Sequence, residues 1–213
     1  MTKAILWDLD GVLVDTAPFH FQAWQELFRS LGKGFAEGDF RRTFGLRNDA
    51  ILADILGELT PAEIERLAQR KEELYREKME GRVTAIPGAM GLLRRLQQRG
   101  RKSAIVSSTT RENVRVVLGS LGLESAFEAV VAEEDAPKGK PDPQGFLVAA
   151  EKLGVAGGEC VVIEDAPGGV EAAKRAGMRC IGVTTSRARE ALTAADLVVD
   201  SLEEATVYEF LGI

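Results

Sequence analysis

The chain has 213 residues, of which 45% are hydrophobic and 28% charged, so it can bury a full core as one large domain or one domain with an insertion. The formal net charge of −6 argues against nucleic acid and anionic membranes as partners, and no apolar run approaches the roughly 20 residues of a membrane span. We expect no signal peptide and therefore a cytoplasmic protein, which we take to be a monomer. Cys160 and Cys180 lie in separate apolar runs, which predicts two buried free thiols.

The first apolar run predicts a short buried strand that ends in two carboxylates. Residues 4–7 are followed by Asp8, Leu9, Asp10 and Gly11. Alternate side chains of a strand share a face, so Asp8 and Asp10 are expected to point the same way and to repel unless a cation or a shared proton lies between them. Gly11 lets the backbone turn. The alternative is an ordinary Asp-Gly turn after a strand.

The next block of the chain is predicted to be entirely helical. Apolar residues at helical spacing predict a helix over 16–31 and two short helices within 41–59. Thr60, Pro61 and Glu63 form a capping box that begins a longer helix, which ends at Gly81. Its charged residues Lys71, Glu72, Glu73 and Arg76 are predicted to form mostly a solvated face.

After residue 87 the pattern changes to apolar strands that alternate with helices. Five such strands are predicted, at residues 102–107, 129–132, 161–163, 180–183 and 197–199. Strands that are apolar throughout, each followed by a helix, indicate a parallel sheet covered on both faces. We therefore predict a doubly wound, Rossmann-like α/β core of residues 1–14 and 87–213. An all-helical cap of residues 15–86 is inserted after the first strand.

Polar side chains cluster where these strands end. Parallel strands deliver their last residues to one edge of the sheet, where open α/β sheets bind ligands. Four strand ends would contribute there: Asp8 and Asp10, Ser107 and Ser108, Lys138 and Lys140, and Glu164 and Asp165. Carboxylates suit Mg²⁺, hydroxyls and lysines suit a phosphoryl group, and one carboxylate could attack phosphorus while a second transfers protons. Lys140, which precedes a Pro-Asp-Pro segment and a helix start, is better anchored than Lys138.

The same residues resemble the four motifs of the haloacid dehalogenase superfamily, in order and over nearly the whole chain. The motifs are Asp8-Leu9-Asp10-Gly11-Val12, Ser107, Lys140 before Pro141, and Glu164-Asp165 with the glycines that follow. The resemblance implies that Asp8 is the nucleophile and Asp10 the general acid and base. It implies Mg²⁺ bound by Asp8, the backbone carbonyl of Asp10 and Asp165, with Glu164 assisting. Ser107 and Lys140 would hold the transferred phosphate.

Within that superfamily the cap segment is similar to β-phosphoglucomutase and its phosphatase relatives. The similarity lies in Asp15-Thr16-Ala17, in His20-Phe21 with Ala23-Trp24, and in a lysine of the long cap helix. Thr16, His20, Arg47 and Lys71 are therefore candidates for contact with substrate. Packing offers another role for His20, and solvent exposure another for Lys71 and Arg47. Asn48 stands where the mutase has a phosphate-binding arginine, which favours a phosphatase of a small phosphorylated metabolite such as a sugar phosphate.

Two other functions fit parts of the pattern. The first is a hexose-phosphate mutase, favoured by Asp15-Thr16, His20 and Lys71. The second is a non-catalytic phospho-acceptor domain, which also gathers aspartates, a hydroxyl and a lysine at a sheet edge. Such a domain needs no cap, and this chain devotes about seventy residues to one.

Overall fold

The computed structural model describes residues 2–213, and these residues form two units. The first unit comprises residues 2–15 and Thr84–Ile213, and the second comprises Thr16–Val83. The second unit is thus inserted into the first just after the first strand. No helix among the described residues is long and apolar enough to cross a membrane.

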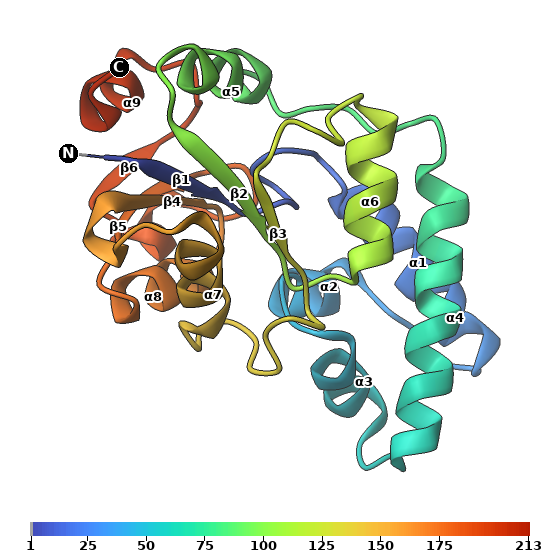
Figure 1. Cartoon of the computed structure of the whole chain (residues 1–213). Coiled ribbons are helices and arrows are strands. Elements are labelled where there is room, and N and C mark those ends of the chain that lie inside the picture. Colours follow the sequence, from blue (N-terminus) through green and yellow to red (C-terminus); the bar gives the residue numbers. More distant parts are fainter. Residues whose placement is uncertain (1) are drawn as a thin grey trace. The chain divides into compact units, whose positions relative to one another are not determined.

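The first unit is built on a six-stranded, fully parallel sheet with the order β3-β2-β1-β4-β5-β6 (Figure 1). Its strands are β1 Ala4–Trp7, β2 Lys102–Val106, β3 Ala129–Val131, β4 Cys160–Glu164, β5 Arg179–Val183 and β6 Leu197–Val199. The strand order reverses between β1 and β4, which is the point where doubly wound sheets bind ligands. The predicted fold class is confirmed.

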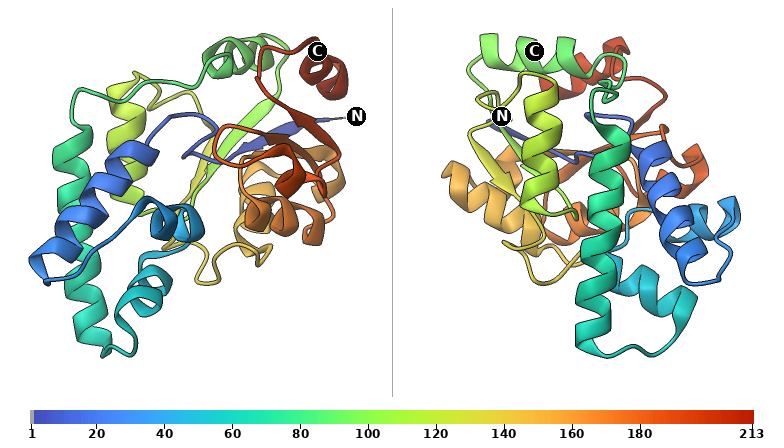
Figure 2. Two further views of the ribbon diagram at one scale, coloured as in Figure 1. Left: turned by 180° about the vertical axis from the view of Figure 1, so that it is seen from behind. Right: turned by 90° about the vertical axis from the view of Figure 1, so that its right-hand side faces the viewer.

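Helices cover both faces of this sheet, as the apolar strands require. Helices α7 and α8 pack on one face, and α5 and α9 lie on the other (Figures 1 and 2). The helices of this unit are α5 Ala89–Gln98, α6 Arg111–Ser120, α7 Gln144–Leu153, α8 Pro167–Arg175 and α9 Ala205–Leu211, with short 3₁₀ turns at Gly157–Glu159 and Arg189–Leu192. Cys160 and Cys180 are buried free thiols in this core, as predicted.

The second unit is entirely helical within its described residues. It consists of α1 Ala17–Ser30, α2 Glu37–Thr43, α3 Asn48–Leu56 and α4 Pro61–Met79. α1 lies along α4, and α3 also packs on α4 (Figure 2). Stacked aromatic rings fill its interior: Phe28 lies against Trp24 and Phe35, with ring centroids 5.3 and 5.0 Å away.

Several predicted element bounds differ from the structure. α2 begins at Glu37, ahead of the predicted start at residue 41. The spacing of Thr109 and Glu112 predicts a capping box at the start of α6. The cap is instead Thr110, whose side chain accepts a hydrogen bond from the Asn113 amide. The capping box at Thr60 and Glu63 is confirmed, and the reciprocal bond from the Thr60 amide to Glu63 measures 2.8 Å.

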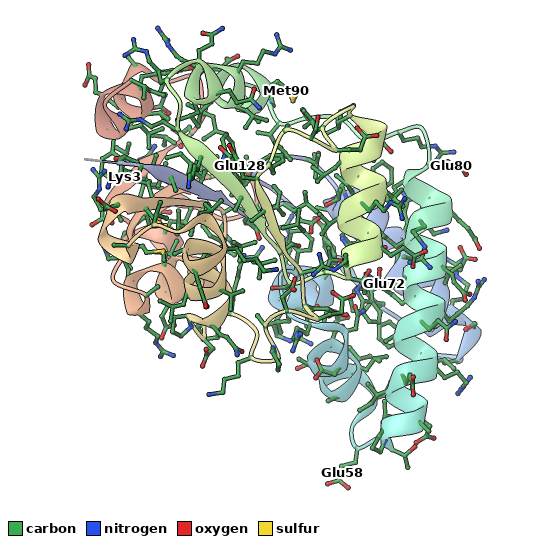
Figure 3. The ribbon with its side chains drawn as sticks, in the orientation of Figure 1. Lys3, Glu58, Glu72, Glu80, Met90 and Glu128 are labelled. Atoms are coloured by element: carbon green, nitrogen blue, oxygen red, sulfur yellow. The ribbon has the colours of Figure 1, made fainter. Side chains whose placement is uncertain are left out.

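The predicted solvated face of α4 is wrong for two residues. Lys71 and Glu72 are buried, with only 2% and 5% of their surface exposed. Glu72 lies midway along α4 (Figure 3). Charged residues at such positions are usually solvated, but Lys71 contacts His20 and Glu72 accepts a hydrogen bond from Asn48 within the same unit. These polar partners make the burial of the two charges tolerable.

Candidate functional site

One lysine joins two carboxylates at the carboxyl ends of β1 and β4. Trp7 pairs with Ile163 in the sheet, so Asp8 and Glu164, which follow them, reach the same edge. The Lys140 ammonium donates to Asp8 Oδ1 at 2.5 Å and to Glu164 Oε1 at 2.6 Å. It also contacts the Val106 carbonyl at the end of β2, 3.3 Å away. Three predicted site residues from distant segments of the chain, Asp8, Lys140 and Glu164, are therefore in direct contact.

The charges in this cluster alter one another. Burial raises the pKa of Asp8, Lys140 lowers it, and Glu164 and Asp10 raise it, so that the pKa is about 7 in total. Burial would lower the pKa of Lys140, but the two carboxylates raise it above its ordinary value. Lys140 therefore stays an ammonium, while Asp8 lacks enough positive charge around it to ionise readily.

Glu164 is held by the backbone that follows it. Its Oε2 accepts hydrogen bonds from the amides of Asp165 and Ala166, both at 2.8 Å. A Cβ on Gly169 would lie 1.7 Å from Glu164 Oε1, so only glycine leaves room for this carboxylate. Both oxygens of Glu164 are thus engaged, one by Lys140 and one by the start of α8. This arrangement suits a residue that positions Lys140 and the loop after β4.

Asp165 carries a buried oxygen that needs a partner. Its Oδ2 has no hydrogen-bond partner among residues 2–213, although the side chain is buried. Gly11, with a φ of +87°, approaches it so closely that a Cβ there would lie 2.0 Å from this oxygen. Burial, Glu164 and Asp8 raise the pKa of Asp165 well above its ordinary value, while the nearby Ser186 hydroxyl and the Lys140 charge oppose them.

This donor set fits a hard divalent cation. In the described part of the chain, no three acidic, histidine or cysteine side chains form a ready cage for a metal ion. A cation that used the carboxylates of Asp8 and Asp165 would nevertheless satisfy the partnerless oxygen and relieve the like-charge repulsion. Asp10 lies in the turn after β1, which ends at Trp7, and its charge is one of those that raise the pKa of Asp8.

Ser107 directly follows β2, which ends at Val106, at the same edge of the sheet. It is buried, and its Oγ accepts a hydrogen bond from the Thr109 amide at 3.2 Å. Ser108 is half-buried beside it. Lys138 is mostly exposed and faces Asp142 at 3.9 Å, so the structure places Lys140 rather than Lys138 in the carboxylate cluster.

Comparison with known proteins identifies the family. Residues 2–177 match the family described as haloacid dehalogenase-like hydrolase. The chain belongs to the haloacid dehalogenase-like hydrolases. Members of this family typically depend on Mg²⁺, which agrees with the chemistry of the donor set above.

Relatives of this hydrolase include both phosphatases and mutases. Hexitol phosphatase A of Escherichia coli is 37% identical over 96% of this chain and 94% of its own. β-Phosphoglucomutase of Bacillus subtilis is 34% identical over 96% of this chain and 92% of its own. The structure of β-phosphoglucomutase from Clostridium difficile superimposes with a TM-score of 0.90 at 28% identity, covering 99% of this chain and 97% of that one.

The second unit, Thr16–Val83, which we call the cap unit, contains a buried polar cluster of its own. Lys71 Nζ lies 2.8 Å from both His20 Nδ1 and Glu72 Oε1. The Asn48 amide donates to the same Glu72 oxygen at 2.7 Å. Although burial would raise the pKa of Glu72, Lys71, His20 and Asn48 lower it to about 2. Glu72 is therefore a carboxylate at neutral pH, and it compensates the charge of Lys71.

The other cap candidates lie at the starts of helices. Thr16 is buried at the N-cap of α1, and Arg47 is half-buried at the N-cap of α3. His20 stacks on Tyr75 with ring centroids 3.9 Å apart, and Lys71 also lies 5.0 Å from that ring. The structure thus brings His20 and Lys71 into one cluster, within the cap unit.

The sequence patterns did not indicate the roles of three residues: Glu72, Thr185 and Ser186. The charged neighbours of Glu72 predict a surface residue, yet Glu72 is the counter-ion of Lys71. The Thr185 and Ser186 hydroxyls, in the loop after β5, donate to the carbonyls of Gly11 and Asp165. The rule that found four polar strand ends would have found this fifth one, because the run Thr184-Thr185-Ser186 directly follows β5.

Proposed function

We propose that this hydrolase is a Mg²⁺-dependent phosphatase that removes the phosphoryl group from a small phosphorylated sugar or a similar metabolite. The observation that carries the proposal is the convergence of Asp8, Lys140, Glu164 and Asp165 at the ends of β1 and β4. One ammonium is shared by two carboxylates, and a third carboxylate has a partnerless oxygen. Such a site needs a cation and would stabilise a phosphoryl dianion once the cation is present.

Asp8 is the proposed nucleophile. One of its carboxylate oxygens forms a bond to phosphorus, and the bond between phosphorus and the ester oxygen breaks. Asp10, acting as general acid, gives the departing oxygen a proton and so releases the alcohol. Asp10 then takes a proton from water as that water attacks phosphorus. The acyl phosphate bond to Asp8 breaks, and inorganic phosphate leaves.

Lys140 and Ser107 are the proposed ligands of the transferred group. The Lys140 ammonium already contacts Asp8, so it can stabilise negative charge both on the Asp8 carboxylate and on the phosphoryl group that becomes bound to it. Glu164 holds that ammonium in place and keeps the loop after β4 in register. Asp8, the Asp10 carbonyl and Asp165 are the groups that would hold Mg²⁺. When bound, it supplies charge neutralisation that lets a carboxylate approach a phosphate.

The substrate class is inferred from the relatives together with the cap cluster. Hexitol phosphatase A, by its name, acts on phosphorylated sugar alcohols. In the cap unit, the Glu72 carboxylate neutralises the charge of Lys71 and also accepts a hydrogen bond from the Asn48 side-chain amide. Within this unit the carboxylate thus offsets the positive charge that Lys71 could offer to a second phosphate, and Asn48 carries no charge of its own. We therefore favour hydrolysis of a substrate with one phosphate.

The test is the Asp8→Asn variant, assayed with an aryl phosphate and Mg²⁺ and then with a panel of phosphorylated sugars. Turnover should fall to background while circular dichroism shows an intact fold, because an amide cannot act as the nucleophile. Asp196→Asn is the matched control: Asp196 also pairs with a lysine, at 2.7 Å, but on the exposed surface, so activity should persist. Wild-type turnover in Asp8→Asn would exclude Asp8 as nucleophile.

A hexose-phosphate mutase is the second candidate, favoured by the relative from Bacillus subtilis. Incubation with β-glucose 1-phosphate and a trace of the bisphosphate separates the two functions. We expect free phosphate and no glucose 6-phosphate. Rapid isomerisation with little phosphate released would instead establish the mutase.

A further inference from the structure

The loop after β5 presents three consecutive hydroxyls, each with a different backbone or side-chain acceptor. Thr184 Oγ1 donates to Asp200 Oδ1 at 2.7 Å. Thr185 Oγ1 donates to the Gly11 carbonyl. Ser186 Oγ donates to the Asp165 carbonyl at 3.1 Å. The second and third acceptors belong to the loops after β1 and β4.

Those two loops meet at the partnerless carboxylate oxygen. Gly11 lies so close to Asp165 that there is no space for a Cβ between them. A small rotation of either peptide would therefore move Asp165 Oδ2 relative to Asp8, which begins the loop after β1. Hydrogen bonds to the two carbonyls restrain that rotation from outside the cluster.

Anchoring of the β5 loop itself does not require these two hydroxyls. The Thr184 amide already donates to the Val199 carbonyl at 3.0 Å. The Asp200 carboxylate accepts a hydrogen bond from the Thr184 hydroxyl and forms an ion pair with Arg189. Thr185 is exposed and Ser186 half-buried, so removing either hydroxyl opens no cavity in the core. The contacts that remain unexplained are the two that reach the Gly11 and Asp165 carbonyls.

We propose that Thr185 and Ser186 are positioning residues that hold the loops after β1 and β4 in register and so set the affinity of the Asp8–Asp165 site for a divalent cation. This inference rests on the proposed function, because it assumes that those carboxylates bind the cation. The two hydroxyls act through the Gly11 and Asp165 peptides and do not touch the substrate.

The experiment measures Mg²⁺ binding directly, by calorimetric titration of chelator-treated protein in the absence of substrate. The variants are Thr185→Val, Ser186→Ala and the double variant. We expect affinity for Mg²⁺ to fall by about 10- to 100-fold in the double variant, the range typical of outer-shell changes at metal sites. Phosphatase kcat at saturating Mg²⁺ should change much less than the Mg²⁺ concentration needed for half-maximal activity.

Two controls separate positioning from general damage to the loop. Thr184→Val removes the neighbouring hydroxyl that bonds Asp200, and it should leave Mg²⁺ affinity unchanged. Thr185→Ser and Ser186→Thr keep the donors and should also bind Mg²⁺ as the wild type does. Melting temperatures measured without Mg²⁺ report folding, and if the double variant is unfolded, the single variants decide the matter.

Two results would overturn the inference: unchanged Mg²⁺ affinity in the folded hydroxyl-deleted variants, or an equal loss in Thr184→Val. Failure of the proposed function looks different, since the wild-type protein itself would then show no Mg²⁺ binding, or would bind Mg²⁺ without hydrolysing any phosphomonoester. In the second case, weaker Mg²⁺ binding by the double variant would still support the positioning role.

Discussion

At the scale of single residues, the site at the strand ends is short of positive charge. Asp8 and Glu164 share the Lys140 ammonium, while Asp165 has an oxygen without a partner among the described residues. Burial and neighbouring carboxylates raise the pKa values of both Asp8 and Asp165. A cation is the simplest complement to this arrangement, and the proposal of Mg²⁺ depends on it.

Two neighbouring glycines of α8 allow a matched test of the close packing around Glu164. A Cβ at Gly169 would lie 1.7 Å from Glu164 Oε1, whereas a Cβ at Gly168 would meet nothing within 4 Å. We expect Gly169→Ala to lower the free energy of unfolding by about 2 kcal/mol, because the carboxylate must move. Gly168→Ala should change it by at most about 0.5 kcal/mol, in the stabilising direction. Urea unfolding measures both, and equal effects would contradict the assigned clash.

The buried Glu72 predicts a specific dependence of stability on pH. Its pKa is about 2 in the folded protein and 4.5 as the ordinary value, so its contribution is present above pH 4.5 and is lost as the pH falls toward 2. At roughly 1.4 kcal/mol per pKa unit, the loss is on the order of 3 kcal/mol. Glu72→Gln should remove this part of the acid sensitivity. Glu73→Gln, on the same helix but 40% exposed, should not. Unfolding free energies at pH 5 and pH 3 for the three proteins decide the point.

At the scale of elements, the helix caps are local features that sequence can predict. Thr60 and Glu63 bond each other reciprocally at the start of α4, because the residues that exchange these bonds are three apart in the chain. The same reasoning placed the cap of α6 one residue too early, at Thr109. Adjacent threonines offer two possible caps, and Thr109 instead bonds the Asn113 side chain.

Removal of the Thr60 hydroxyl tests the weight of this cap. Thr60→Ala should destabilise the protein by about 1 kcal/mol, because an amide of the first turn of α4 loses its acceptor. Thr60→Ser retains the hydroxyl and should stay within a few tenths of a kcal/mol of the wild type. Thermal unfolding followed by circular dichroism provides the comparison. A loss of equal size in both variants would assign the effect to the lost methyl group rather than the cap.

At the scale of the whole molecule, the inserted unit leaves and rejoins the sheet unit at adjacent points. The Asp15 amide donates to the Thr84 carbonyl at 3.3 Å, and the Ile86 amide donates to the Leu13 carbonyl at 2.9 Å. Val14 and Ala85 form an antiparallel bridge between the same two segments. The two segments of the sheet unit that flank the insertion are therefore already paired as in a hairpin, so a short turn could replace the insertion.

We expect a variant in which residues 16–83 are replaced by about four Gly and Ser residues to fold. The sheet keeps its own core, so the variant should unfold cooperatively and retain Mg²⁺ binding, since the carboxylate cluster lies entirely within the sheet unit. Calorimetric Mg²⁺ titration and thermal unfolding test this. Asp8→Asn in the shortened chain serves as the control and should lose the binding. An unfolded product would show that the sheet unit depends on the insertion.

Most of the fold followed from patterns that are local along the chain. Apolar runs alternating with capped helices predicted every strand of the sheet and its parallel class, because periodicity and capping act over a few residues. The placement of Lys71 and Glu72 did not follow, because their charges resemble those of the solvated residues beside them. Only their partners His20 and Asn48, which lie far along the chain, show why they can be buried.

The amino-acid sequence alone determined the α/β class, the helical insertion after the first strand, the family and the set of strand-end candidates, since all of these depend on residue identity and short spacings. Tertiary structure alone decided that Lys140 bridges Asp8 and Glu164, that Asp165 has a partnerless oxygen beside Gly11, and that Thr185 and Ser186 hold the loops that meet there. The reason is that hydrogen bonds and charge compensation depend on distances between strands, and those distances exist only after segments far apart in the chain have come together.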